Sequence, residues 1–355
     1  MKTHIEKIDF FRGIAILLVF VYHSSLVIFP GYQQVVLYTH LRDYLLNYAP
    51  SAFGGTGVQL FLVISGFLIH YGTIRNNLKF ENLKFFNKRF WRIWPPYILA
   101  LSFFYMVIGS YNHTDFFTHF FLVHNLFDKT IFTINPSFWS LALEAQLYLI
   151  YPIYLFLYKK YGNNKSFFII AIISLSFLIA QFVFNINTAA YGTSVFKNWI
   201  VWIMGAYLAD VFYNKKRVSK IKGWQLIVLY FLVIAPSHAG ATLSNLFPLF
   251  SNYLFAAFYT LLIDWYLNKE TGNKSNFIYK IIVSTGICSY SIYLFHQPFL
   301  YQSLFFFHFG FFSFLIMVPL VFAFYYIVSM LLHKYIELPS IQFGSKFYNL
   351  IKRNN

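Results

Sequence analysis

Residues 8–29 read IDFFRGIAILLVFVYHSSLVIF, an apolar run interrupted by Asp9, Arg12 and His23. A helix that spans a bilayer needs about 20 mostly apolar residues, and this run has that length. The run is typical of the whole chain, since 59% of the 355 residues are hydrophobic and only 11% are charged. Soluble domains carry about 25% charged residues, so this chain has too little charge to cover a surface in water. The sequence therefore predicts an all-α, polytopic membrane helical bundle and excludes a soluble enzyme.

The same length criterion marks about ten apolar stretches as candidate transmembrane helices. They are 8–29, 54–74, 94–110, 137–158, 166–184, 194–213, 224–241, 247–267, 279–301 and 304–332. A further apolar stretch, Phe116–Phe127, is too short to cross the bilayer, and we expect it to be a re-entrant or interfacial piece. The expected domains are a membrane domain at 1–335 and a short cytoplasmic tail at 336–355.

The lysines and arginines predict which ends of these helices face the cytoplasm. With the N-terminus inside, all but three of the 27 basic residues fall on the cytoplasmic side, the exceptions being Arg42, Lys129 and Lys197. This bias is the positive-inside rule of multi-pass proteins, and it places both termini in the cytoplasm. It also accounts for the net charge of +16 without a nucleic-acid partner, because the basic residues are scattered over separate segments.

Ionisable residues inside apolar helices are costly, so each one is a functional candidate. Arg12 and His23 are eleven residues apart, which puts them on one helix face with His23 about 16 Å deeper in the membrane. Histidine exchanges a proton near neutral pH, so His23 is a candidate general base. The structural alternatives are a packing histidine with a hydrogen bond to another helix and an arginine that reaches to the membrane boundary.

Glu144 lies in the predicted span 137–158, at a depth comparable with that of His23. A carboxylate beside a histidine fixes the imidazole's tautomer and raises its basicity, so we expect the two residues to form an acid–base dyad. Trp139 and Ser140 lie on the same helical side as Glu144. The alternative for Glu144 is a structural hydrogen bond to another helix.

Two arginines, Arg89 and Arg92, follow a run of lysines just before the predicted span 94–110. Because they are three residues apart, they point to one side of a helix at the cytoplasmic surface. Guanidinium groups bind phosphate through paired hydrogen bonds, although any basic cluster beside a membrane also attracts anionic lipid. A phosphate-binding cluster at the inner surface and a base in mid-membrane fit a donor with a charged head and a long arm. This arrangement favours acyl transfer over ion transport.

Several separated motifs resemble those of the integral-membrane acyltransferase family 3, the O-acetyltransferases that modify bacterial surface polysaccharides. The matching segments are Ile8–Ala15 with His23, Gly57–Ile69, Arg89–Arg92, Phe138–Glu144, Ser289–Pro298 and Glu337–Pro339. The resemblance covers nearly the whole chain, and the family's ten helices with both ends inside agree with the predicted topology. One departure is Ala145, at which many relatives carry a second acidic residue.

The resemblance implies a multi-pass enzyme of a bacterial plasma or inner membrane that moves an acetyl group from cytoplasmic acetyl-CoA to a hydroxyl of a cell-surface glycan. No metal is expected. The implied site residues are His23 and Glu144 for catalysis, Arg12, Arg89 and Arg92 for the phosphates of the coenzyme, and Trp139, Ser140 and His296 for contact with the acceptor or for structure. Glu337 is expected to cap the last helix or to pair with Lys334 at the surface.

The rival class of protein is a membrane transporter or exporter of a glycan or small molecule, in which His23 and Glu144 handle protons. A carrier usually places polar groups along several helices, whereas the mid-membrane ionisable residues here reduce largely to these two. The sequence leaves open the acceptor, the acyl group, the membrane face that presents the acceptor, the effect of Ala145 and the oligomeric state. The single cysteine, Cys288, excludes an intramolecular disulfide.

Overall fold

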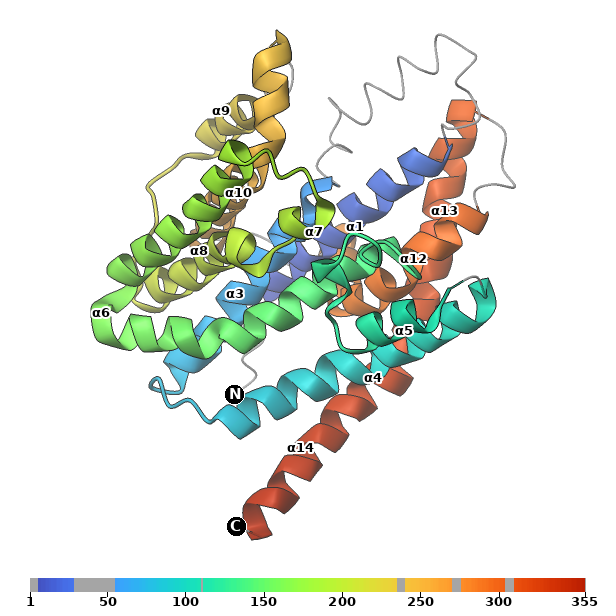
Figure 1. Ribbon diagram of the computed structural model, residues 1–355, viewed down its shortest axis with the longest axis horizontal. Coiled ribbons are helices and arrows are strands. Elements are labelled where there is room, and N and C mark those ends of the chain that lie inside the picture. Colours follow the sequence, from blue (N-terminus) through green and yellow to red (C-terminus); the bar gives the residue numbers. More distant parts are fainter. Residues whose placement is uncertain are drawn as a thin grey trace.

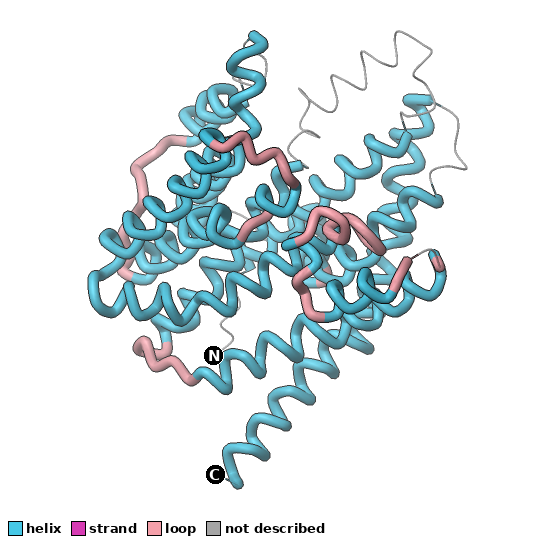
Figure 2. Tube along the Cα trace, viewed as in Figure 1, coloured by secondary structure: helices cyan, strands magenta, loops and turns pink. Residues whose placement is uncertain are grey.

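The computed structural model describes residues 6–28, 55–109, 111–234, 240–269, 276–303 and 310–354. Within these ranges the regular structure is helical, with no strand (Figure 2). The predicted all-α class is therefore confirmed for this part of the chain. Arg42 and the stretches 235–239 and 304–309, which belong to two predicted spans, lie outside the described residues.

The helices form one bundle, in which α9 and α10 lie at one side, α12 and α13 at the other, and α1 and α3 between them (Figure 1). A π-helical turn at His333–Glu337 joins α13 to α14, and short 3₁₀ turns lie at His124–Leu126 and Pro136–Phe138. The helices are α1 (Glu6–Ile28), α3 (Gly57–Arg75), α4 (Asn82–Ile108), α5 (His113–Phe120), α6 (Trp139–Val183), α7 (Ala189–Gly192), α8 (Val195–Tyr213), α9 (Gly223–Ile234), α10 (Gly240–Asn268), α11 (Phe277–Ile287), α12 (Ser289–Ser303), α13 (Gly310–Leu332) and α14 (Leu338–Asn354).

By length and apolarity, five helical segments of the described residues are able to cross a bilayer. They are α3, α4, residues 136–183, residues 189–213 and residues 316–353. The pair α11 and α12 makes a sixth if the two count as one span, although they meet at an angle of 78°. The protein is thus a multi-pass membrane protein. The expected number of about ten spans and the cytoplasmic position of both termini stay predictions.

Three of the predicted spans contain or adjoin one of two breaks in the helices. The spans 137–158 and 166–184 are the two arms of α6, which meet at Gly162, where φ is 78°. Glycine adopts this left-handed conformation without a Cβ penalty, so the helix kinks there. The span 279–301 is broken at Cys288, between Gly286 and Ser289, two residue types that commonly accompany sharp kinks.

Glycines allow two pairs of helices to cross in backbone contact. On α3 and α8, a Cβ at Gly66 or Gly205 would overlap a backbone carbonyl oxygen of the facing helix. The same is true of Gly13 on α1 and Gly286 on α11. Small residues at such crossings are the main means by which membrane helices approach closely. These contacts hold α1, with its Arg12, against the bent α11–α12 pair.

The stretch that we expected to be re-entrant or interfacial, Phe116–Phe127, contains the C-terminal part of α5 and a 3₁₀ turn. The side chain of Asn112 accepts a hydrogen bond from the backbone N–H of Asp115, and the Asp115 carboxylate accepts one from the N–H of Asn112, which fixes the start of α5. Eight residues rise only about 12 Å, so α5 is too short to cross a bilayer.

The segment 336–355, expected as a short tail, consists largely of α14, which lies against α4. Trp91 of α4 packs edge-to-face on Phe343 of α14, with ring centroids 4.7 Å apart. At the start of α4, the Tyr348 hydroxyl donates a hydrogen bond to the Glu81 carboxylate at 2.6 Å. The end of the described chain is therefore a packed helix.

Candidate active site

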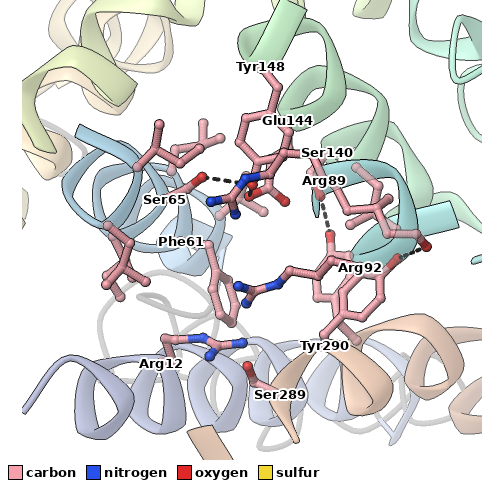
Figure 3. Close-up of a pocket in the computed structure, with 18 residues that line it drawn as sticks. Arg12, Phe61, Ser65, Arg89, Arg92, Ser140, Glu144, Tyr148, Ser289 and Tyr290 are labelled. Atoms are coloured by element: carbon pink, nitrogen blue, oxygen red, sulfur yellow. Dashed lines mark hydrogen bonds between the residues drawn. The ribbon is translucent and has the colours of Figure 1, made fainter. Parts of the chain in front are cut away.

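A pocket with an empty volume of about 820 Å³ lies among α1, α3, α4, α6 and α12 (Figure 3). Its lining combines basic, acidic and hydroxyl side chains with apolar walls, and comprises Arg12, Val58, Phe61, Leu62, Ile64, Ser65, Leu68, Ile69, Arg89, Arg92, Ile93, Ser140, Leu141, Glu144, Tyr148, Ser289, Tyr290 and Tyr293. Five of the eight expected site residues therefore meet in one pocket.

The three expected phosphate-binding arginines come together although they lie on two helices. Arg89 and Arg92 extend from one face of α4, and Arg12 reaches toward them from α1 (Figure 3). Arg12 forms a salt bridge with Asp9 at 3.3 Å. In the described part of the chain, no carboxylate lies within salt-bridge distance of Arg89 or Arg92.

Glu144 is the one carboxylate of the pocket lining, and it faces the arginines of α4. The Tyr148 hydroxyl, one turn further along α6, donates a hydrogen bond to Glu144. Ser65 lies 3.1 Å from that hydroxyl and accepts a bond from Trp202 Nε1 at 3.2 Å. Because the Tyr148 proton goes to Glu144, Ser65 donates to Tyr148. Three helices, α3, α6 and α8, thus fix the carboxylate in place.

The expected acceptor-side residues occupy different places. Ser140 lines the pocket, and its hydroxyl lies 2.7 Å from that of Tyr293, which donates to the carbonyl oxygen of Ser137 at 2.9 Å. Trp139 lies outside the lining and packs against the hydrophobic core. Its indole therefore has a structural contact, while Ser140 faces the pocket.

His23 is hydrogen-bonded to His296, with His23 Nδ1 and His296 Nε2 3.0 Å apart. Neither histidine lines the pocket, but Tyr293 joins them to it, since its ring lines the pocket and lies 5.3 Å from the His296 ring. The expected contact between His23 and Glu144 is not among the hydrogen bonds of the described residues. The structure places Glu144 with the arginines and gives His23 a second histidine as its partner.

Two further residues take positions that sequence reasoning missed. Glu337 is buried and bonds His333 at 2.8 Å and Ser291 at 3.2 Å, so the expected surface pairing with Lys334 is wrong. The π-helical turn that contains Glu337 brings its side chain inward to α12.

Tyr293 had no assigned role, although its spacing of three residues before His296 places both on one face of α12.

The comparison with known proteins identifies the family. The sequence model of an acyltransferase domain, that of acyltransferase family 3, matches residues 5–334. Because this match covers nearly the whole chain, the protein belongs to this family and is an acyltransferase. The resemblance that the motifs indicated is confirmed.

Individual relatives share a quarter to a third of their residues with this chain over the aligned segments. The peptidoglycan O-acetyltransferase OatA of Listeria monocytogenes is 25% identical over 335 residues, which cover 84% of this chain and 49% of the relative. The O-acetyltransferase OatA of Staphylococcus aureus is 26% identical over 298 residues, covering 72% of this chain and 47% of the relative. A protein of Haemophilus influenzae is 34% identical over 152 residues, covering 37% and 61%. The chain thus spans about half of the length of the two OatA proteins. No solved structure matches it significantly.

Proposed function

We propose that this protein is a membrane O-acetyltransferase that moves an acetyl group from cytoplasmic acetyl-CoA to a hydroxyl of a cell-surface glycan. The observation that carries the proposal is the convergence of Arg12, Arg89 and Arg92 on one pocket whose lining holds a single carboxylate. An excess of guanidinium groups in a shielded site favours a multiply charged anion. The names of the OatA relatives support O-acetyl transfer, and one of them names peptidoglycan as the acceptor.

The arginines and apolar side chains of the pocket support acetyl-CoA as the proposed donor. This donor supplies an activated thioester together with phosphate groups. Arg89 and Arg92 would bind phosphate oxygens with their paired N–H groups, and Arg12 would add a third guanidinium. Apolar side chains such as Phe61 and Leu62 line the same pocket and would contact the uncharged part of the donor. Glu144 would hold the two arginines of α4 in orientation through its opposite charge.

The chemical step needs a base, and His23 is our candidate. As the acceptor oxygen forms a bond to the acyl carbon, His23 would take the hydroxyl proton. The bond between the acyl carbon and sulfur then breaks, and the proton passes from His23 to the leaving thiolate. An alcohol and a thioester thereby become an ester and a thiol, so that atoms and charge balance. Tyr293 lines the pocket and contacts His296, Ser140 is hydrogen-bonded to Tyr293, and both would contact the reacting groups.

The test compares cells that carry wild-type protein with cells that carry His23→Ala, with equal amounts of protein in the membrane. Base-labile acyl groups released from surface polysaccharide are quantified, and free thiol is measured in membranes supplied with acetyl-CoA. We expect the variant to lose one acyl species and the release of thiol that depends on the acceptor. A protein that transports a glycan without acyl transfer would release no thiol in either strain, and this result would refute the proposed function.

A further inference from the structure

The contacts of His296 determine which of its ring nitrogens carries a proton. His296 Nδ1 lies 2.8 Å from the backbone carbonyl oxygen of Tyr293, one turn earlier on α12. A carbonyl oxygen only accepts hydrogen bonds, so Nδ1 of His296 is the donor. The side chain is fully buried, and its hydrogen bonds within the described residues involve no carboxylate. Since an unpaired charge is costly to bury, His296 is neutral and its Nε2 is an acceptor.

This assignment determines the state of His23 in turn. Because His296 Nε2 accepts, the His23 Nδ1 that lies 3.0 Å away must donate. In a neutral imidazole only one nitrogen carries hydrogen, so the lone pair of His23 is on Nε2.

We infer that His296 is a positioning residue, which holds His23 in the tautomer protonated at Nδ1 and thereby presents His23 Nε2 as the base. This inference rests on the proposed function of the pocket. Two hydrogen bonds form this chain. The Nδ1–H of His23 donates to Nε2 of His296, and the Nδ1–H of His296 donates to the backbone carbonyl of Tyr293. The role is the one that a carboxylate has in an acid–base triad, in which the partner orients the imidazole and fixes its tautomer. It accounts for His23 having a histidine partner while Glu144 lies with the arginines.

α12 connects the histidine pair with the pocket in which the reaction is proposed to occur. Tyr293 anchors His296 with its carbonyl oxygen, and its ring lines the pocket. One turn of α12 therefore contacts both the pocket and the histidine pair. A displacement of this turn would alter the hydrogen bond with which His296 orients the base on α1.

The test is a pair of substitutions of similar size at one position. In His296→Gln the amide oxygen is able to accept the bond from His23, whereas His296→Met leaves the Nδ1–H of His23 without that acceptor. Acetyl transfer is measured with purified full-length protein in detergent, with acetyl-CoA and polysaccharide from the host. We expect His296→Met to lower kcat about tenfold with KM for acetyl-CoA unchanged, and His296→Gln to recover most of that loss.

Unchanged kcat in His296→Met would overturn the inference. An equal loss in both variants, with matching decreases in thermal stability, would also overturn it, because that result indicates packing alone.

A second readout is independent of activity. The ¹⁵N signals of histidine-labelled protein that are lost in His23→Gln and only shifted in His296→Gln are those of the His23 ring nitrogens. We expect Nδ1 to have the shift of a protonated nitrogen and Nε2 that of an unprotonated one, and the reverse assignment would overturn the inference. If the wild type transfers no acyl group, the proposed function fails, while this spectrum still decides the tautomer.

Discussion

The Nδ1 atom of His23 and the Nε2 atom of His296 lie 3.0 Å apart, although the two residues are 273 positions apart in the sequence. The first lies on α1 and the second on α12, so the contact joins the first helix of the matched family domain to one of its later helices. The glycine crossing of α1 with α11 supports it, because α12 begins where α11 ends. The orientation of the candidate base therefore depends on how α1 packs against α11 and α12.

Arg89→Lys should weaken donor binding. Lysine keeps the charge but loses the planar fork that binds two phosphate oxygens, so we expect the apparent Kd for acetyl-CoA to rise about tenfold. The matched control is Arg75→Lys, an exposed arginine at the end of α3 that is absent from the pocket lining. Equilibrium binding of labelled acetyl-CoA measures both variants. Equal affinities in both would assign Arg89 to lipid contact.

His23→Ala should abolish transfer and leave the protein in the membrane. A positioned general base contributes about 10²- to 10⁴-fold to the rate, and alanine has no group to replace it. We expect donor binding to stay unchanged, because His23 is outside the pocket lining. The rate of acetyl transfer and the affinity for acetyl-CoA are measured on the same preparation. Full activity in this variant would exclude His23 as the base.

Glu144→Ala should also abolish transfer, but for a different reason. The carboxylate accepts the Tyr148 bond and faces the arginines, so its loss leaves Arg89 and Arg92 without their opposite charge in the lining. We expect the affinity for acetyl-CoA to fall together with the rate of transfer. Tyr148→Phe, which removes one hydrogen bond and keeps the charge, should have a smaller effect. A Glu144→Ala protein with normal kinetics would contradict the assignment.

Gly205→Ala should destabilise the bundle. The added Cβ would overlap the carbonyl oxygen of Val63, and relief of such overpacking costs about 1–3 kcal/mol. The control is Gly72→Ala on α3, where a Cβ meets no atom within 4 Å and alanine favours the helix by about 0.5–1 kcal/mol. Thermal unfolding of the detergent-solubilised protein should show a lower melting temperature for the first variant alone. Equal melting temperatures would show that α3 and α8 separate easily.

Docking of α14 on α4 should weaken in acid. The hydrogen bond from Tyr348 and the nearby Lys84 lower the pKa of Glu81, so the carboxylate stabilises the contact at neutral pH. That stabilisation is lost as the pH falls below about 4.3, the ordinary glutamate value, and through the lowered pKa. The effect is small because the ion pair is exposed.

Spin labels at Leu83→Cys on α4 and Lys346→Cys on α14 measure this docking. We expect their distance distribution to broaden between about pH 6 and about pH 3.5. Glu81→Gln, which has no titratable group at this position, should show no such change. A distribution that is the same for both proteins at every pH would disprove a role for Glu81.

Part of the candidate site was predictable because it depends on spacing along one helix. Arg89 and Arg92 are three residues apart, so a helix alone places them on one face. The partner of His23 was not predictable: the expected hydrogen bond with Glu144 is not among those of the described residues, because equal depth in a membrane does not determine which way two helices are rotated. The structure instead turns Glu144 toward Arg89 and Arg92.

The sequence by itself determined the helical class, the membrane setting and the family, because apolar length, scarcity of charge and ordered motifs are local properties. Only the tertiary structure decided which polar groups meet. Close crossings at Gly13 and Gly286, and the bend between α11 and α12, set the rotation of helices that are distant in sequence. Those contacts bring Arg12 to Arg92 and His23 to His296. Lipid-facing and partner-facing apolar residues look alike in a sequence, so the rotation of each helix about its axis is known only from the packed bundle.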